Sequence, residues 1–425
     1  MSRIITSIVA ITLVFLSFSG CAKIDKTNLT KIEVAFWGSP EEKEIITETI
    51  NKWEKDHPNI KVILNHIAAN GYSSKILTRI AAGSAPDIMF AEVNIFTSFM
   101  EKGAFLDLTQ FINEDPDISI DDFFPEVVDR FTIGGKLYCL PRDTAPFACV
   151  FYNKSIFDAA EIPYPKDDWT MDEMLETAKK LTIRKGNEIT QYGFYSWCWM
   201  NFIYSFGGSI VDNVKNPGEF TFERPGTIEG IQFYSDLMNK YEVMPSSTAL
   251  ANIGMALWEL FTSGKLAMYS SGIWETPQFR KISNFDWDVV MFPKGPSGTR
   301  AFGTGGSGYC IYKETKYPRE AWLVLKALSG SEGQGKLAED GLAQPAMRKI
   351  AEGPAWALSS QKPKNKKMLN EAVKYVIYEP FTPKWREIQD NVIMPNLDLV
   401  FNGKKKMAEM APEIDKKANI LLNEK

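Results

Sequence analysis

Short apolar runs alternate with amphipathic segments over the first part of the chain. The apolar runs are KIEVAFWG (31–38), NIKVILNHI (59–67) and DIMFAEV (87–93). Between the first two, Ile46, Ile50 and Trp53 recur at the spacing of one helical face. This order predicts strand, helix, strand, helix, strand, and therefore an α/β fold with a parallel sheet covered by helices.

Two positions at the ends of these predicted strands are candidates for ligand contact. In open parallel sheets, ligands bind beyond the carboxyl ends of the strands. Trp37 follows the first strand and Glu92 ends the third. Their alternative roles are core packing for Trp37 and helix capping for Glu92.

Capping signals mark the starts of two predicted helices. Ser39 precedes Pro40, and Glu42 stands three residues after Ser39. Thr170 is likewise followed three residues later by Glu173. Both patterns predict a capping box, in which the two side chains satisfy each other's backbone amides.

The segment YGFYSWCWMNFIYSFGG (192–208) is unusually rich in aromatic residues. Three rings alternate in its first half and would project to one face of an extended chain: Tyr195, Trp197 and Trp199. Phe202 and Phe206 are four residues apart, which predicts a short helix facing the core. We therefore expect an exposed aromatic rim followed by a core helix.

Two segments resemble connections between lobes. Residues 134–157 predict a turn, a strand, a proline-containing joint and a second strand, and residues 286–303 predict a strand followed by a Pro/Gly-rich passage. The joints lie near 140–146 and 292–303. After about residue 330 the chain is mostly helical in pattern.

The N-terminus has the layout of an export signal. Residues 1–20 contain Arg3, a broken apolar run too short to span a membrane, and small residues before Cys21. The junction resembles a bacterial lipobox with Phe18 in place of the usual leucine, which predicts lipidation of Cys21. A plain signal-peptidase site is the alternative. Residues 22–30 are polar and predict a tether.

Composition favours a soluble globular protein without nucleic-acid partners. The chain has 425 residues, 44% hydrophobic and 24% charged, with a net charge of −5. This length exceeds what one core usually supports, so two lobes are expected. Besides Cys21 the cysteines are Cys139, Cys149, Cys198 and Cys310, and none forms a CxxC pattern. Cys139 and Cys149 either pair or remain buried thiols.

No enzyme motif is convincing. GTGGSG (303–308) matches the dinucleotide fingerprint, but a strand-like run follows where the fingerprint needs a helix. His57 and His66 lack a metal-ligand partner at helical spacing, so neither a metal nor a cofactor is expected. No G-x-S-x-G elbow exists. A carboxylate pair for glycoside hydrolysis is a spatial feature, so an exported carbohydrate-active enzyme stays an alternative.

Several segments together resemble one family. In chain order they are VAFWGSPEE, AAGSAPDIMFAE, GGKLYCLPRDTAPFACVFYNKSIF, WTMDEMLETAKKLT, YGFYSW, FIYSFGGSIVD, FTSGKLAMYSSGIW and FDWDVVMFPKGP, and then GTGGSGYCIYKETKYPREAWLVLKAL. The set resembles the extracellular solute-binding proteins of bacterial ABC importers, in the sugar-binding branch known as family 1. The chain departs from this pattern at Cys139, where the family commonly has glycine.

The resemblance implies a two-lobe periplasmic-binding-protein-like fold of type II, with three hinge crossings and a ligand cleft between the lobes. The third crossing is expected near 330–341. The N-terminal lobe would comprise 31–140 and 297–333, and the C-terminal lobe 141–296 and 334–425. The implied protein is an exported, lipid-anchored monomer that binds a carbohydrate and meets the transmembrane permease subunits. It is not an enzyme.

Sugar recognition needs flat rings for C–H faces and charged groups for hydroxyls. The candidate rings are Trp37, Trp197, Trp199, Trp274 and Trp385. The resemblance supplies Trp274, which follows the family's Gly-x-Trp pattern, and Trp385, on a tail helix. The polar candidates are Glu92, Asp143 and Arg348, the last also from the resemblance. Tyr195, Asn201, Gly305 and Gly306 complete the set.

Other interpretations stay open at this stage. The rings could be core residues, Asp143 could form a hinge salt bridge, and Arg348 could form a surface one. The ligand could be a polyamine or glycerol phosphate, although phosphate should recruit several basic side chains. A structural or adhesive lipoprotein would lack a closable cleft.

Overall fold

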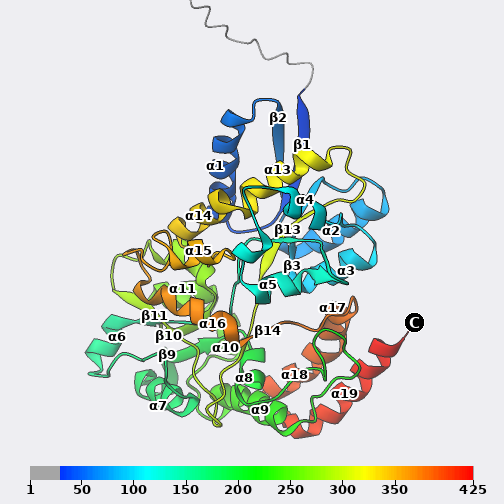
Figure 1. Cartoon of the computed structure of the whole chain (residues 1–425). Coiled ribbons are helices and arrows are strands. Elements are labelled where there is room, and N and C mark those ends of the chain that lie inside the picture. Colours follow the sequence, from blue (N-terminus) through cyan, green and yellow to red (C-terminus); the bar gives the residue numbers. More distant parts are fainter. Residues whose placement is uncertain (1–28, 425) are drawn as a thin grey trace, which may run out of the picture.

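Residues 29–424 are described by a computed structural model, and Cys21 with the expected export signal lies outside them. The chain forms two α/β lobes, each built on one five-stranded sheet (Figure 1). The N-terminal lobe has strand order β2-β1-β3-β13-β6. Its strands are β1 (Thr30–Phe36), β2 (Ile60–His66), β3 (Ile88–Glu92), β6 (Leu140–Pro141) and β13 (Ser307–Ile311).

The predicted start of the fold is confirmed. β1 pairs in parallel with β2 and β3, while β13 runs antiparallel to β3 and β6. The helices of this lobe are α1 (Pro40–Asp56), α2 (Ala69–Ala81), α3 (Val93–Glu101), α4 (Thr109–Glu114), α5 (Pro125–Arg130), α13 (Pro318–Ser329) and α14 (Ser331–Asp340). Ile46, Ile50 and Trp53 of α1 are buried, as their spacing predicts.

The C-terminal lobe has strand order β11-β7-β10-β9-β8. Its strands are β7 (Cys149–Asn153), β8 (Ile183–Lys185), β9 (Glu188–Ser196), β10 (Leu266–Ser271) and β11 (Trp287–Met291). The helices that precede β11 are α6 (Lys154–Ala159), α7 (Met171–Leu181), α8 (Met200–Ser205), α9 (Pro225–Asn239), α10 (Ser247–Ile253), α11 (Leu257–Thr262) and α12 (Thr276–Phe279).

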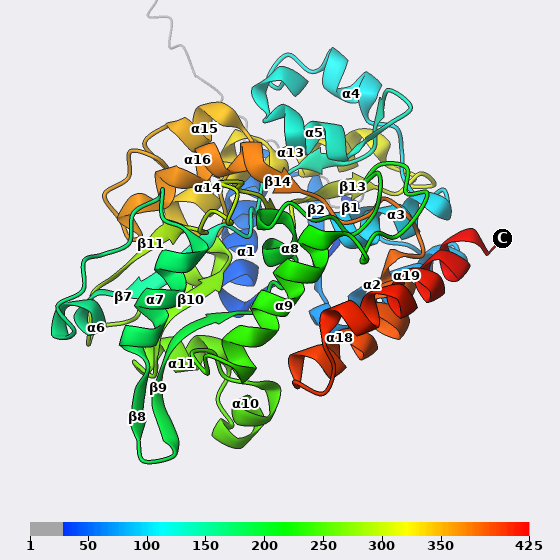
Figure 2. The ribbon, with the colours of Figure 1, turned by 90° about the horizontal axis from the view of Figure 1, so that it is seen from below.

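The chain returns to this lobe through α15 (Arg348–Glu352) and α16 (Leu369–Ala372), and it ends in α17 (Trp385–Ile388), α18 (Met394–Phe401) and α19 (Met407–Asn423). α18 and α19 pack beside α9, as the two views show (Figures 1 and 2). The expected helical tail is therefore present.

Two crossings lie where the sequence predicts them. The chain passes from β6 in one sheet to β7 in the other, and returns from β11 to β13. Between them, β12 (Phe302–Gly303) pairs in parallel with β14 (Val376–Ile377). The two crossings therefore lie where the two sheets meet.

The third crossing is not at 330–341. That segment is helix α14, which binds α1 through Lys52–Glu332 at 2.7 Å and Lys336–Glu48 at 3.0 Å. The expected lobe boundary at 333/334 therefore falls inside a helix, and Ala346 beyond it still accepts from Phe124 N–H of the N-terminal lobe at 2.9 Å. The helix itself ends at Gly341. The glycine there has φ +74° and ends the helix in the left-handed conformation.

The two predicted capping boxes differ in outcome. At Thr170 the box is complete: Glu173 N–H donates to the hydroxyl at 3.2 Å, and the Glu173 carboxylate accepts from Thr170 N–H at 2.8 Å. At Ser39 the hydroxyl accepts from Glu42 N–H at 3.2 Å, but the Glu42 carboxylate binds Arg142. That box is half formed because the carboxylate has a buried cationic partner.

The cysteines in the described residues are buried free thiols. Cys139 and Cys149 do not pair, because Cys149 lies in the C-terminal sheet opposite Ser271 and Met291. From Leu29 to Glu424, no helix combines the length and apolarity that crossing a membrane requires.

Candidate functional site

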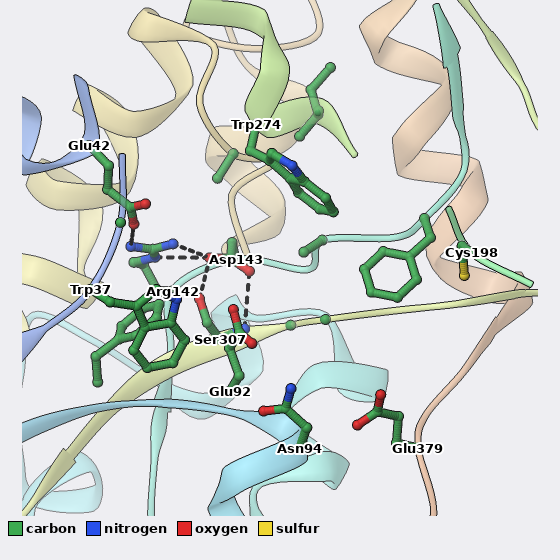
Figure 3. Close-up of a pocket in the computed structure, with 18 of the residues that line it drawn as sticks. Trp37, Glu42, Glu92, Asn94, Arg142, Asp143, Cys198, Trp274, Ser307 and Glu379 are labelled. Carbon is green, nitrogen blue, oxygen red and sulfur yellow. Dashed lines mark hydrogen bonds and ion pairs between the residues drawn. The ribbon is translucent and has the colours of Figure 1, made fainter. Parts of the chain in front are cut away.

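A cavity of about 510 Å³ lies between the lobes, at the carboxyl ends of β1 and β3. Both lobes and both crossings line it. Figure 3 shows Trp37 and Trp274 on opposite sides of this cavity, with Asp143 between them. Its size falls within the range of small-molecule sites.

The N-terminal lobe contributes Trp37. This residue follows β1, so the strand end directs it toward the cavity, as predicted. Its ring contacts Tyr72 at 4.6 Å and Phe90 edge-on at 4.3 Å between ring centroids. Tyr72 is itself fixed, because its hydroxyl donates to the backbone oxygens of Ala35 and Phe90. The indole therefore has a rigid support and a half-buried face.

The C-terminal lobe contributes a cluster of three rings. Phe147 meets Trp197 at 4.9 Å and Trp274 at 5.8 Å, both edge-on, and the two tryptophans are 6.3 Å apart. Trp197 Nε1–H donates to Ser271 Oγ at 3.3 Å. Such edge-to-face contacts fix ring orientation and leave flat faces for a ligand.

The position of Trp274 depends on the glycine two residues before it. A Cβ at Gly272 would lie 1.8 Å from the Trp274 ring. Only a residue without a side chain allows the indole to fold back over the strand end. The Gly-x-Trp pattern therefore has a steric cause, and it leaves Trp274 36% exposed on the cavity wall.

The aromatic segment is only partly as predicted. β9 ends at Ser196, and the chain then turns, with Trp199 N–H donating to Trp197 O at 3.2 Å. Trp197 and Trp199 both line the cavity, but Tyr195 is buried in the sheet beside Tyr269. The three rings do not share a face because the extended chain ends between the first and the second. Phe202 and Phe206 both pack on Phe233, as their spacing predicts.

Arg142 organises the polar wall. Its guanidinium binds Asp143 Oδ2 through Nε at 2.9 Å and Nη2 at 2.8 Å, and Glu42 Oε1 through Nη1 at 2.5 Å. It also lies 4.5 Å from the Phe90 ring centroid. One buried cation thus joins helix α1 to the first crossing.

Asp143 joins the two crossings. Its Oδ1 accepts from Ser307 N–H at 3.0 Å, and its Oδ2 accepts from the Ser307 hydroxyl. Ser307 begins β13, directly after Gly305 and Gly306, which line the cavity. Gly306 has φ +55°, a conformation that favours glycine.

Two further acidic residues, Glu92 and Glu379, line the cavity. Burial, reinforced by nearby Asp143, raises the pKa of Glu92 to about 8. Burial likewise raises the pKa of Glu379. Glu379 Oε2 and Asn94 Oδ1 have no hydrogen-bond partner within the described part of the chain. Figure 3 shows Glu92, Asn94 and Glu379 together on the side of the cavity away from Trp274.

The structure brings together the following candidates at the cavity: Trp37, Glu92, Asp143, Trp197, Trp199, Trp274, Gly305 and Gly306. Gly305 N–H is already used, because it donates to Ala145 O at 3.1 Å. Both lobes and both crossings therefore supply predicted residues.

Four candidates lie elsewhere. Tyr195 is in the sheet core, as described above. Asn201 is fully buried and clamps the crossings, with Nδ2 donating to Phe147 O at 2.7 Å and Oδ1 accepting from Gly303 N–H at 2.9 Å. Arg348 begins α15 on the surface and donates to the backbone oxygen of Asp121. Trp385 is buried against Phe220, with ring centroids 6.3 Å apart.

Sequence reasoning missed several lining residues: Glu42, Phe90, Asn94, Arg142, Phe147, Glu379 and Arg386. Arg142 lies in the predicted joint near 140–146, and Phe147 directly follows it. The position of this joint between the lobes was therefore the signal that could have identified both residues as cavity lining. Arg386 is the neighbour of Trp385, which shows that the right helix was identified at the wrong helical phase.

Several residues outside the cavity lining have structural surroundings. His57 Nδ1 and His66 Nε2 lie within hydrogen-bonding distance of backbone oxygens of Trp53 and Gly38. GTGGSG leads into strand β13, and no group of metal-ligating side chains occurs within residues 29–424. Trp53, Trp169, Trp287 and Trp322 are buried.

Comparisons with known proteins agree with this architecture. The model of the family described as bacterial extracellular solute-binding protein matches residues 37–335. A Brucella abortus protein named as a binding protein is 23% identical over 391 residues, covering 88% of this chain and 89% of its own. An arabinooligosaccharide-binding protein of Halalkalibacterium halodurans is 22% identical and covers 67% of this chain and 64% of its own.

Among solved structures, an ABC substrate-binding protein of Listeria monocytogenes in complex with cycloalternan superposes with a TM-score of 0.84. It is 25% identical, and the match covers 93% of this chain and 100% of that one. The two-lobe fold with a cleft between the lobes is thereby confirmed.

Proposed function

Because the chain belongs to the bacterial extracellular solute-binding protein family, we propose that it is the binding component of an ABC importer and captures a mono- or oligosaccharide between its lobes. It then delivers this ligand to the membrane permease. The names of two similar proteins, which refer to arabinooligosaccharide and cycloalternan, support a sugar rather than another solute.

The observation that carries the proposal is a cavity with rings on opposite walls and acceptors between them. Trp37 comes from one lobe, and Trp197 and Trp274 come from the other. Flat rings suit the C–H faces of a pyranose, and carboxylates accept from its hydroxyls. A ligand that touches both walls binds the closed protein better than the open one, which favours closure.

The charge of the cavity argues against a phosphate ligand. Its basic lining residues are Arg142, already bound to two carboxylates, and Arg386, paired with Asp390 at 2.8 Å. The acidic lining residues are Glu42, Glu92, Asp143 and Glu379. Both basic side chains of the described lining therefore already have acidic partners, so neither is free to bind a phosphate. A polyamine remains the second candidate, because the carboxylates would also accept ammonium groups.

A thermal-shift screen of the protein against carbohydrates, polyamines and glycerol phosphate tests the ligand class. A ligand at 100 times its dissociation constant should stabilise the protein by about 2.7 kcal/mol. Stabilisation by a sugar, without products on prolonged incubation, supports the proposal. A response to amines or phosphates alone, or sugar turnover, contradicts it.

Trp274 and Trp258 form a matched pair for the site. They are 36% and 37% exposed, but only Trp274 lines the cavity. Trp274→Ala should weaken sugar binding by about 2–4 kcal/mol, measured by calorimetry, because a stacking ring is removed. Trp258→Ala should leave affinity unchanged. Equal effects would place the ligand elsewhere.

We also propose that Cys21 carries a lipid that anchors the exported monomer to the membrane. The motif at residues 18–21 and the polar tether support this. In cells, Cys21→Ser should release the protein from the membrane fraction and abolish incorporation of a labelled fatty acid. Retention of both would refute the anchor.

A further inference from the structure

Two of the buried cysteines lie on neighbouring strands of the N-terminal sheet. β6 and β13 are antiparallel, with Leu140 opposite Tyr309 and Pro141 opposite Gly308. Cys139 directly precedes β6, and continuing this register by one position would place it opposite Cys310. Directly opposite residues of an antiparallel pair have Cα atoms about 4.5–5.5 Å apart. Disulfides span Cα distances of about 4.4–6.8 Å.

The side chains point to the same face. A Cβ on Gly308 would lie 2.6 Å from Cys139 Sγ, so this sulfur sits over the glycine. Gly308 and Cys310 are two residues apart on one strand and therefore share a face. Burial, reinforced by the neighbouring Cys139 thiol, raises the pKa of the Cys310 thiol. The missing side chain at Gly308 leaves room for the Cys139 sulfur on this face.

From this geometry we propose that Cys139 and Cys310 form a disulfide in the exported protein. The bond would join the strand that enters the first crossing to the strand that leaves the second. It would hold together the two strands next to Asp143 and Ser307, which line the cavity. Exported proteins reside where disulfides persist.

The chemistry requires an external disulfide as oxidant. One thiolate attacks a disulfide of an exchange catalyst or of oxidised glutathione and releases one thiolate from it. The second cysteine then displaces the remaining partner. The two cysteines lose two electrons and two protons, and the reagent disulfide becomes two thiols. Both cysteines are fully buried, so the exchange must precede completion of the sheet.

The remaining described cysteines provide internal controls. Cys149 lies opposite Ser271 and Met291 in the other lobe. Cys198 Sγ donates to Asn201 Oδ1 at 3.2 Å. Neither has a cysteine facing it across a strand pair, so both should stay reduced.

Peptide mapping tests the bond without any variant. The full chain, exported to a bacterial periplasm, is denatured, alkylated without reductant and digested. A second sample is reduced, unfolded and refolded with oxidised and reduced glutathione. We expect one peptide pair linked through Cys139 and Cys310, with Cys149 and Cys198 alkylated. Alkylation of Cys139 and Cys310 in both samples, or their linkage to other cysteines, overturns the proposal.

A stability measurement gives an independent result. A disulfide typically shifts the unfolding equilibrium by on the order of 100-fold, so reductant should lower the urea midpoint. Cys139→Ser and Cys310→Ser should remove the response to reductant, whereas Cys149→Ser should retain it. If reductant leaves the urea midpoint of the wild-type protein unchanged, the proposed bond is contradicted. Sugar binding is not involved in either readout.

Discussion

The buried cation Arg142 should be essential to the stability of the site. Its side chain is 8% exposed, and those of its partners Glu42 and Asp143 are 13% and 2% exposed. Arg142→Met keeps much of the volume but leaves two carboxylates buried without a cation. Breaking a buried pair in this way costs about 3–5 kcal/mol. Loss of the contact with Phe90 adds to this.

Arg79→Met is the matched control. Arg79 binds Glu33 at 2.6 and 2.8 Å in the same lobe, but their side chains are 25% and 28% exposed. A pair that water reaches is worth at most about 1 kcal/mol. Urea unfolding followed by tryptophan fluorescence should therefore show a much larger loss for Arg142→Met than for Arg79→Met.

The reasoning also predicts a rescue. If the cost comes from orphaned carboxylates, adding Glu42→Gln and Asp143→Asn to Arg142→Met should recover part of the lost stability. Equal midpoints for Arg142→Met and Arg79→Met would refute the assignment. So would a triple variant that is no more stable than Arg142→Met alone.

Three further predictions concern single residues. The pKa of Glu92 is about 8 in the folded protein against an ordinary 4.5, so the folded state holds a proton that the unfolded chain releases between these values. The free energy of unfolding should fall as pH rises through this window, by at most about 5 kcal/mol. Urea unfolding at pH 5 and at pH 8 should show a smaller fall for Glu92→Gln than for the wild-type protein; an equal fall in both proteins would contradict the prediction. Gly272→Val should displace the Trp274 ring and weaken sugar binding at least about tenfold by calorimetry; unaltered affinity would show that the ring does not contact ligand. Asn201→Leu should cost about 1–3 kcal/mol per backbone group left unsatisfied in the crossings, measured as a lower urea midpoint; a neutral effect would mean that water replaces the amide.

The strand ends were predictable because they depend on local pattern. Apolar runs separated by helical periodicity identify β1 and β3 and the direction in which they run. Trp37 and Glu92 follow from that direction, since parallel strands end at one edge. No long-range information is needed for either residue.

The polar network was not predictable in the same way. Glu42 and Arg142 are 100 positions apart, and nothing in the local sequence links them. The capping pattern at Ser39 even suggests another partner for Glu42. The partner of a carboxylate depends on which groups the folded chain brings near it. A buried guanidinium binds a carboxylate more strongly than an exposed backbone amide does.

Helical phase explains the error at Trp385. Consecutive helical residues point about 100° apart, so α17 can bury Trp385 against Phe220 while Arg386 faces the cavity. The sequence identifies the helix, but its rotation is set by packing against α3 and α19. For Tyr195, Trp197 and Trp199 the error was different: they do not share one face, because the extended chain ends at Ser196.

Two exposed ion pairs join the lobes outside the cavity, and each contributes little to the free energy of closure. Lys281 binds Glu41 at 2.8 Å across the lobes, but these side chains are 62% and 26% exposed. Lys215 pairs with Asp129, and both are more than half exposed. Exposed pairs contribute at most about 1 kcal/mol each. A ring contact with ligand is worth about 2–4 kcal/mol, and rings project from both walls. One ring contact with ligand therefore outweighs either of these ion pairs, so substitutions at Lys281 should change affinity far less than substitutions at Trp37 or Trp274.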